Sequence, residues 1–287
     1  SAASDVYKRQ KYTRTKMALL NGVSVVLELP VQYATGSADI FAKGAVTILN
    51  SSGIIDALSF GSESGSANMF NDIAEVLNNE PPEFRNLLKN YLNTGLSYPS
   101  ARNKTLEDFL NKPLEFLNKP NNILALEYVR QLKLLNSSIK PITVKRLKSD
   151  YNSTELSGEI SSASAIRTAL LKNDMSALSS VPENCIKLMH GKKIPVLDDY
   201  SDILSYLLCT VPPKELALYA DITEGLENRI LNTDFKTISE LISKTKTKRY
   251  TYSKIQKAIL HIILSITKEE QQKAPEYISC LLYTSDA

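Results

Sequence analysis

The sequence has few of the residues that most often carry enzyme chemistry. Its 287 residues include three cysteines, two histidines and no tryptophan. The cysteines, Cys185, Cys209 and Cys280, are widely spaced and odd in number, which argues against a disulfide framework and a cysteine-ligated zinc site. The same scarcity fits a reduced, cytoplasmic protein. Of the two histidines, His190 and His261, the second lies in an apolar helical pattern, which favours a packed core residue over a catalyst.

The sequence also lacks a large excess of charge of one sign and has no long apolar run. Lys and Arg total 34 against 31 Asp and Glu, so the net charge of +3 does not by itself indicate a nucleic-acid binder. No uncharged apolar run reaches the roughly 18 residues that a membrane span needs, and the first residues have no apolar signal core. Apolar residues make up 43% and charged residues 23%, which excludes wholesale disorder.

The two ends differ in pattern from the rest of the sequence. Residues 1–10 (SAASDVYKRQ) and 280–287 (CLLYTSDA) resemble translated sequencing-adapter sequence, and the alternative is a pair of frayed native termini. We therefore leave both ends out of the fold prediction.

Strand and helix signals alternate through the first half of the chain. Strands are predicted at Val23–Leu29, Ile54–Phe60 and Ile142–Leu147, with helical patterns between them. This alternation is typical of βαβ crossovers and a parallel sheet. After about Pro195 the strand signals stop and only helical patterns follow. The sequence thus predicts an α/β domain over residues 11–193 and an all-helical domain over residues 194–279.

Three short segments place small or polar residues where a nucleotide could bind. Gly61 follows the second strand, at the edge where open α/β sheets bind ligands, although a plain turn is the alternative. Asn121 and Asn122 stand at the start of a helix, where N-capping is the favoured alternative. Arg146 ends the third strand together with Lys145, where it could grip a phosphate or stack on a base, or be a solvated surface charge.

A fourth segment, Ile160–Arg167 (ISSASAIR), gives the strongest of these signals. Ser161, Ser162 and Ser164 would bring hydroxyl groups and backbone N–H groups to the positive end of a helix, which favours an anion. Arg167 lies about one turn further on and points back along the same face. An ordinary capped helix is an equal alternative.

The helical half has one basic segment, Lys244–Lys257 (KTKTKRYTYSKIQK). It holds six basic residues in fourteen and no acidic one, with Tyr250 and Tyr252 interleaved. Cations neutralise phosphates and aromatic rings stack on exposed bases, so the segment is a candidate RNA-binding stripe. The alternative is a solvated helix face.

Taken in order, the segments resemble the bacterial tRNA(Met) cytidine acetate ligases, a branch of the HxGH nucleotidylyltransferase-like proteins. The similarity runs over residues 11–279. It includes FGSESG at Phe60–Gly65, KPNNILALEY at Lys119–Tyr128, ISSASAIR at Ile160–Arg167 and KTKRYTYS at Lys246–Ser253. Each segment alone is modest, but the ordered set is specific.

The resemblance implies a Rossmann-like nucleotidylyltransferase fold and an ATP-dependent ligase. The enzyme would activate acetate as acetyl-adenylate, release pyrophosphate, and acetylate the wobble cytidine of elongator tRNA(Met). No catalytic residue and no dedicated metal ligand can be named, although Mg²⁺ is expected with ATP. The resemblance assigns ATP contacts to Gly61, Asn121 (or Asn122), Arg146, Leu147, Ser164 and Arg167, and tRNA contacts to Lys248, Arg249, Lys254 and Lys257.

One departure from the family concerns its first strands. Members begin with a strand that ends in an HxGH motif and then a second strand, before the segment that matches Lys11. Both are missing from this sequence, so the resemblance implies an N-terminally truncated fragment that is inactive. Two other interpretations are another nucleotidylyltransferase, which makes a dinucleotide cofactor or lipid precursor, and a non-catalytic RNA-binding protein.

Overall fold

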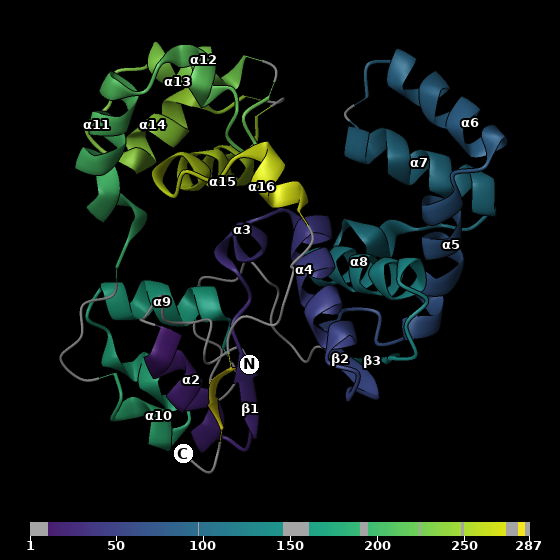
Figure 1. Ribbon diagram of the computed structural model, residues 1–287, viewed down its shortest axis with the longest axis horizontal. Coiled ribbons are helices and arrows are strands. Elements are labelled where there is room, and N and C mark those ends of the chain that lie inside the picture. Colours follow the sequence, from purple (N-terminus) through teal and green to yellow (C-terminus); the bar gives the residue numbers. More distant parts are fainter. Residues whose placement is uncertain are drawn as a thin grey trace. The chain divides into compact units, whose positions relative to one another are not determined.

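The computed structural model describes residues 11–96, 98–145, 161–189, 195–223, 225–247, 250–273 and 281–284 (Figure 1). The chain divides into two compact units. The first unit contains Ser1–Glu28, Leu147–Asp199 and Ile278–Ala287, and the second contains Leu29–Arg146 and Tyr200–Tyr277. The second unit thus includes most of the predicted α/β region and most of the predicted helical region, and the boundary at residue 194 stays a prediction.

A pair of parallel strands lies in the second unit. Strand β2 (Ala57–Ser62) pairs with β3 (Lys140–Lys145), and the register runs from Ala57 opposite Lys140 to Ser62 opposite Lys145. The parallel pairing confirms the predicted α/β class. Because the two strands run in the same direction, their carboxyl ends meet at one edge, and this edge carries Gly61 and Ser62.

The strand bounds differ from the predicted ones by a few residues. β2 begins at Ala57 rather than Ile54, because its partner begins at Lys140 and the ladder starts there. Ile54 lies outside the ladder and is 81% exposed. Gly61, predicted to follow the strand, is its fifth residue and pairs with Val144. The apolar run therefore located the strand but not its last residues.

Helix α8 (Pro120–Leu134) is the central helix beside the parallel pair. It packs against β2, α4 (Ala38–Ser51) and α5 (Asn71–Asn79). The core between these elements includes Phe60, Phe70, Leu126 and Val129, all at most 9% exposed. The remaining elements between the strands are η1 (Ala67–Phe70), α6 (Pro82–Asn93), α7 (Tyr98–Leu110) and η2 (Glu115–Asn118).

The later part of the second unit is helical, as predicted. Its helices are α11 (Ser201–Thr210), α12 (Pro213–Leu216), α13 (Leu226–Leu231), α14 (Ile238–Thr245), α15 (Tyr252–Ile263) and α16 (Lys268–Gln272). The side of α15 formed by Ile255, Ala258, Ile259 and Ile262 is buried. Apolar residues at this spacing give one face that packs inward, which explains why the segment forms a helix.

Contacts within the second unit tie the later helices to its beginning. Short helix α3 (Val31–Ala34) carries Tyr33, which is fully buried and donates a hydrogen bond to the carbonyl of Lys273. The ring of Tyr33 lies against Gly44 of α4, where an added Cβ would be 2.5 Å from the ring carbon Cγ. Glycine at this position is what allows the ring to approach the helix.

The first unit has its own small core. Helix α2 (Lys11–Leu20), α9 (Ala163–Leu171), η3 (Met175–Ser180) and α10 (Glu183–Ile186) bury Met17, Ile166, Ala177 and Cys185. Strand β1 (Val25–Leu27) pairs antiparallel with β4 (Leu281–Thr284), so the prediction that Val23–Leu29 belongs to the parallel sheet is wrong, because its partner comes from the other end of the chain. Residues 281–284, which were left out of the prediction, thus form a strand. Element η4 (Leu197–Tyr200) lies where the two units join along the chain. Within the described ranges, none of the helices is both long and apolar enough to span a membrane.

Candidate functional site

The edge at the carboxyl ends of β2 and β3 is the candidate nucleotide site. Gly61 lies opposite Val144, and Ser62 lies opposite Lys145, the last residue of β3. Lys145 is exposed, as is Gly61. This places the end of the third strand beside Gly61, as predicted. Arg146 and Leu147, which follow directly in the sequence, lie outside the described residues.

A tight turn follows β2 at this edge. The buried hydroxyl of Ser62 accepts a hydrogen bond from the backbone N–H of Gly65, at 2.8 Å. Gly65 has a φ of +71°, and a Cβ there would be 3.0 Å from Cβ of Lys145. A left-handed backbone and a close neighbour both favour glycine. The turn therefore directs the chain back toward the end of β3.

The start of α8 lies at the same edge and is joined to the turn by Glu63. The Glu63 carboxylate accepts hydrogen bonds from the side-chain amide of Asn121 at 2.6 Å and from the backbone N–H of Asn122 at 2.9 Å. The Asn122 side-chain oxygen accepts in return from the backbone N–H groups of Glu63 and Ser64, at 2.9 and 3.2 Å. The structure thus brings Gly61, Asn121 and the end of β3 to one edge.

The two asparagines have different environments, which the sequence did not distinguish. Asn122 is 1% exposed, and its amide nitrogen donates to the carbonyl of Phe116 at 2.8 Å. Both ends of its carboxamide are therefore held by the protein. Asn121 is half-buried. Asn121 is therefore the more accessible of the two, and Asn122 has a structural role.

The serine-rich segment lies in the first unit and forms the predicted capped helix. The Ser162 hydroxyl accepts a hydrogen bond from the backbone N–H of Ala165 at 3.0 Å, which is an N-cap of α9. Arg167 donates to the Ser164 hydroxyl at 3.4 Å, and both side chains are half-buried. The structure therefore brings Ser164 and Arg167 together, as the pattern predicted.

The basic stripe is only partly a solvated surface. Lys248 and Arg249 lie outside the described residues. Tyr250 is 5% exposed, so the expectation that its ring stacks on a base is wrong, because the ring is packed inside the protein. Tyr252 is 42% exposed. Lys254 is half-buried, lies 5.6 Å from the Tyr250 ring centroid and donates to the Thr223 hydroxyl at 2.8 Å.

Lys257 has a structural partner. Its ammonium group donates to the backbone carbonyl of Gly36 at 2.8 Å, in the turn before α4. Burial lowers the pKa of Lys257, while Asp221 and Asp39 oppose that shift. The geometry supports a tie between α15 and the α3–α4 turn, and it does not support a side chain extended into solvent.

His261 is a core residue, as predicted. It is fully buried on α15, with Nε2 3.0 Å from the Thr35 hydroxyl and Nδ1 3.2 Å from the carbonyl of Ala220. The carboxylate of Asp221 lies 3.3 Å from Nδ1. These contacts occupy both ring nitrogens, so His261 is held in place as part of the fold.

A buried carboxylate lies further along α8. Glu127 is 2% exposed and pairs with Arg130 at 2.7 Å and with Arg102 at 3.7 Å. Burial raises the pKa of Glu127, while Arg130 and Arg102 lower it. Burial is the larger effect, and an acid in this environment binds its proton more tightly than in the unfolded chain.

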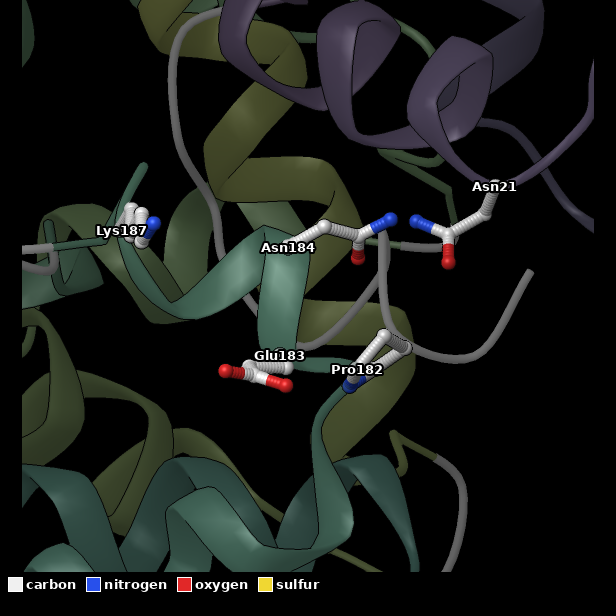
Figure 2. Close-up of a pocket in the computed structure, with 5 residues that line it drawn as sticks. All are labelled: Asn21, Pro182, Glu183, Asn184 and Lys187. Carbon is white, nitrogen blue, oxygen red and sulfur yellow. The ribbon is translucent and has the colours of Figure 1, made fainter.

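One open hollow lies in the first unit, with a volume of about 480 Å³. It is lined by Asn21, Pro182, Glu183, Asn184 and Lys187, and Figure 2 shows the amides of Asn21 and Asn184 turned toward each other. These amides donate to the carbonyls of Met17 and Leu20 at 2.7 and 2.9 Å. The two amides therefore serve the local fold, and none of the predicted site residues lines the hollow.

Comparisons with known proteins show the family of this chain. Residues 9–286 match the family described as HIGH Nucleotidyl Transferase. A tRNA(Met) cytidine acetate ligase of Clostridium perfringens is 39% identical over 287 residues, covering 94% of this chain and 71% of that protein. The chain belongs to the tRNA(Met) cytidine acetate ligase family. A second member, from Thermoanaerobacter sp., is 41% identical over 283 residues, and the match covers 94% of this chain and 70% of that protein.

Two solved structures of Thermotoga maritima TmcAL have the same fold as this chain. The apo crystal structure of Thermotoga maritima TmcAL has a TM-score of 0.88 and 29% identity, covering 96% of this chain and 70% of that chain. The structure of TmcAL bound with alpha-thio ATP has a TM-score of 0.85 and 28% identity, covering 96% of this chain and 69% of that one. The nucleotidylyltransferase fold is therefore shown for this chain.

Glu63 is the residue of the edge to which sequence reasoning gave no role. Its position after Gly61-Ser62 was visible, but its partners lie 58 and 59 residues further along the chain. A glutamate beside a proposed triphosphate site also carries the wrong charge for a direct contact. The only available signal was that a carboxylate stabilises the start of a helix, and the sequence does not say which helix.

Proposed function

We propose that this protein carries the ATP-binding and tRNA-binding parts of the ligase of its family, which acts on acetate and the wobble cytidine of elongator tRNA(Met). The observation that carries the proposal is the gathering of Gly61, Asn121 and the end of β3 at one edge. In open α/β sheets this edge binds ligands, and the relative bound with alpha-thio ATP has the same fold.

The ATP contacts are assigned residue by residue, as the resemblance to the family implies them. We assign Gly61, Asn121, Arg146 and Leu147 to one part of the site. Ser164 and Arg167 would bind phosphate, because a guanidinium and a hydroxyl beside the start of α9 suit an anion. Formation of acetyl-adenylate needs cations and N–H donors that stabilise charge on phosphate, and this reaction needs no protein nucleophile.

Mg²⁺ would arrive with the nucleotide. Over the part of the chain that the structure describes, His, Cys, Asp and Glu side chains form no group of three that could hold a metal ion. The nucleotide's own phosphates are the oxygen ligands that Mg²⁺ prefers in such sites.

We infer that the helical region, over residues 194–279, binds the tRNA. Lys248, Arg249 and Lys254 would contact its phosphates, and Lys257 would contribute by fixing α15 against the α3–α4 turn. We propose that tRNA binding weakens as salt rises, because each phosphate contact releases counterions. Since ATP and tRNA are both cytoplasmic solutes, we expect the enzyme to act in the cytoplasm.

Hydrogen exchange with and without ATP tests the nucleotide site. We expect ATP to slow amide exchange in residues 59–65, 120–124 and 163–167 and to leave α13 and α14 unchanged. If amide exchange is the same with and without ATP in all of these segments, at ATP concentrations up to the millimolar range typical of KM values, the assignment is contradicted.

A second assay tests the chemistry. Neither His190 nor His261 lies in an HxGH pattern, so we propose that this chain binds ATP but does not form acetyl-adenylate. Incubation with labelled ATP and acetate should give no acetyl-adenylate, whereas the Thermoanaerobacter relative serves as the positive control. Formation of acetyl-adenylate by this chain would refute the inactivity proposal and support the ligase assignment.

A further inference from the structure

Glu63 connects the two elements that form the candidate edge. It is the first residue after β2, and its carboxylate lies at the start of α8. One carboxylate oxygen, Oε1, accepts from the side-chain amide of Asn121 at 2.6 Å and from its backbone N–H at 3.4 Å. The other, Oε2, accepts from the backbone N–H of Asn122 at 2.9 Å. A single side chain thus binds three donors of the first helical turn.

Asn122 completes the connection from the opposite side. Its side-chain oxygen accepts from the backbone N–H groups of Glu63 and Ser64. Each element therefore supplies a side chain that binds the backbone of the other. Because Asn122 is 1% exposed, water does not compete for its hydrogen bonds. The residues from 62 to 65 and the start of α8 thus form one hydrogen-bonded assembly.

The assembly determines what the edge can bind. The first N–H groups of a helix and its positive end ordinarily attract anions. At α8, the Glu63 carboxylate already occupies this position. A phosphate is therefore disfavoured at the start of α8, and the edge presents an oriented carboxamide beside a strand end. This is suited to the neutral base and ribose of a nucleotide.

We propose that Glu63 is a positioning residue of the nucleotide site. It acts through Asn121: by accepting from the Asn121 amide nitrogen, it fixes the direction of the carboxamide that we assign to ATP. Glu63 itself does not touch the nucleotide. This inference rests on the proposed function, because it takes Asn121 as an ATP contact.

A double-mutant cycle on ATP affinity tests the inference. Glu63→Gln keeps the shape of the side chain but removes its charge and one acceptor. We expect Glu63→Gln to raise the Kd for ATP about tenfold, the effect of losing roughly one well-placed hydrogen bond. In the Asn121→Ala background, the same substitution should change the Kd by less than about twofold, because the group that it positions is absent.

Glu270→Gln is the matched control. Glu270 also binds the start of a helix, since its carboxylate accepts from the Thr267 backbone N–H at 2.8 Å in the capping box of α16. A general loss of stability would affect both variants alike, so ATP affinity that falls equally in the two would overturn the inference. Equal ATP affinity in Glu63→Gln and the unsubstituted chain would also overturn it, as would additive effects in the cycle.

The failure of the underlying proposal gives a different result. No ATP binding by the unsubstituted chain would overturn the proposed function before any variant is compared. Circular dichroism checks that each variant is folded. If Glu63→Gln is unfolded, Glu63→Asp replaces it in the cycle, because aspartate keeps the charge and withdraws the carboxylate by one methylene. The same non-additivity with Asn121→Ala is then expected, and additivity would overturn the inference.

Discussion

Two lysines of α15 should have separable effects when each is changed to methionine. Lys257 donates to the Gly36 carbonyl at 2.8 Å in a half-buried position, and burial lowers its pKa. A hydrogen bond from a charged group is worth about 1.5–3 kcal/mol, and relief of the ammonium's desolvation offsets part of that loss. We therefore expect Lys257→Met to lower the free energy of unfolding by about 1–2 kcal/mol. In a protein of this size, the expected fall in Tm is roughly 2–3 °C.

Lys254→Met should differ from Lys257→Met in RNA binding. Lys254 donates to the Thr223 hydroxyl, which is a neutral acceptor like the Gly36 carbonyl, so the free energy of unfolding should fall by a similar amount, about 1–2 kcal/mol. Its loss should also reduce the slope of log K for tRNA against log salt by about 0.7–0.9, the value of one phosphate contact. Lys257→Met should leave that slope unchanged.

The assays are urea unfolding and tRNA binding at four or more salt concentrations. Both variants keep the apolar stem of the lysine, so packing against α15 is matched. A reduced salt slope in Lys257→Met, with unchanged unfolding, would refute the reasoning from the Gly36 contact. Equal behaviour of the two variants in both assays would refute the separation of roles.

Three further predictions follow from individual contacts. Arg167→Ala should weaken ATP binding at least tenfold, the effect of about 1.4 kcal/mol, and leave tRNA affinity unchanged in a titration of each ligand. Gly44→Ala should destabilise the protein by about 1–2 kcal/mol in urea unfolding, because the clash with Tyr33 exceeds the gain of about 1 kcal/mol in helix propensity. In a Tyr33→Leu background, the same substitution should stabilise the protein. Glu127→Gln should change the free energy of unfolding by less than about 1 kcal/mol at neutral pH, because the uncharged amide avoids the desolvation that burial imposes on the carboxylate, and this offsets the lost pair with Arg130. Because burial raises the pKa of Glu127, the native state holds this proton more tightly than the unfolded chain does. The free energy of unfolding should therefore fall as the pH rises from about 4.3, the ordinary pKa of glutamate, through the higher native pKa. Glu127→Gln should not show this pH dependence.

The fold class was predictable because it depends on patterns that are local in sequence. Apolar β-branched runs gave the strands near Ala57 and Lys140, and alternation with helices gave the parallel pairing. The strand ends were not predictable to the residue, because a ladder ends where its partner ends. Gly61 was expected after β2 and lies within it, since β3 extends to Lys145.

Only the part of the candidate site that follows from sheet geometry was predictable. Parallel strands bring their carboxyl ends together, so Gly61 and the end of β3 had to share an edge. No such rule predicts the roles of Asn121 and Asn122. Neighbours in sequence at the start of a helix point in different directions, and contacts with Glu63 and Phe116 decide which one is buried.

The basic stripe shows why composition overestimates a binding surface. Lys254 and Lys257 are three positions apart on α15, so they are neighbours on the helix surface. The sequence therefore predicts the same role for both, a contact with RNA. The difference between them comes from Gly36, 221 residues earlier, whose carbonyl lies within reach of only one ammonium group. Tyr250 is buried by the same kind of distant packing. A run of cations with aromatic residues therefore indicates where an RNA surface can form, whereas the partners of each side chain determine which cations remain available to bind it.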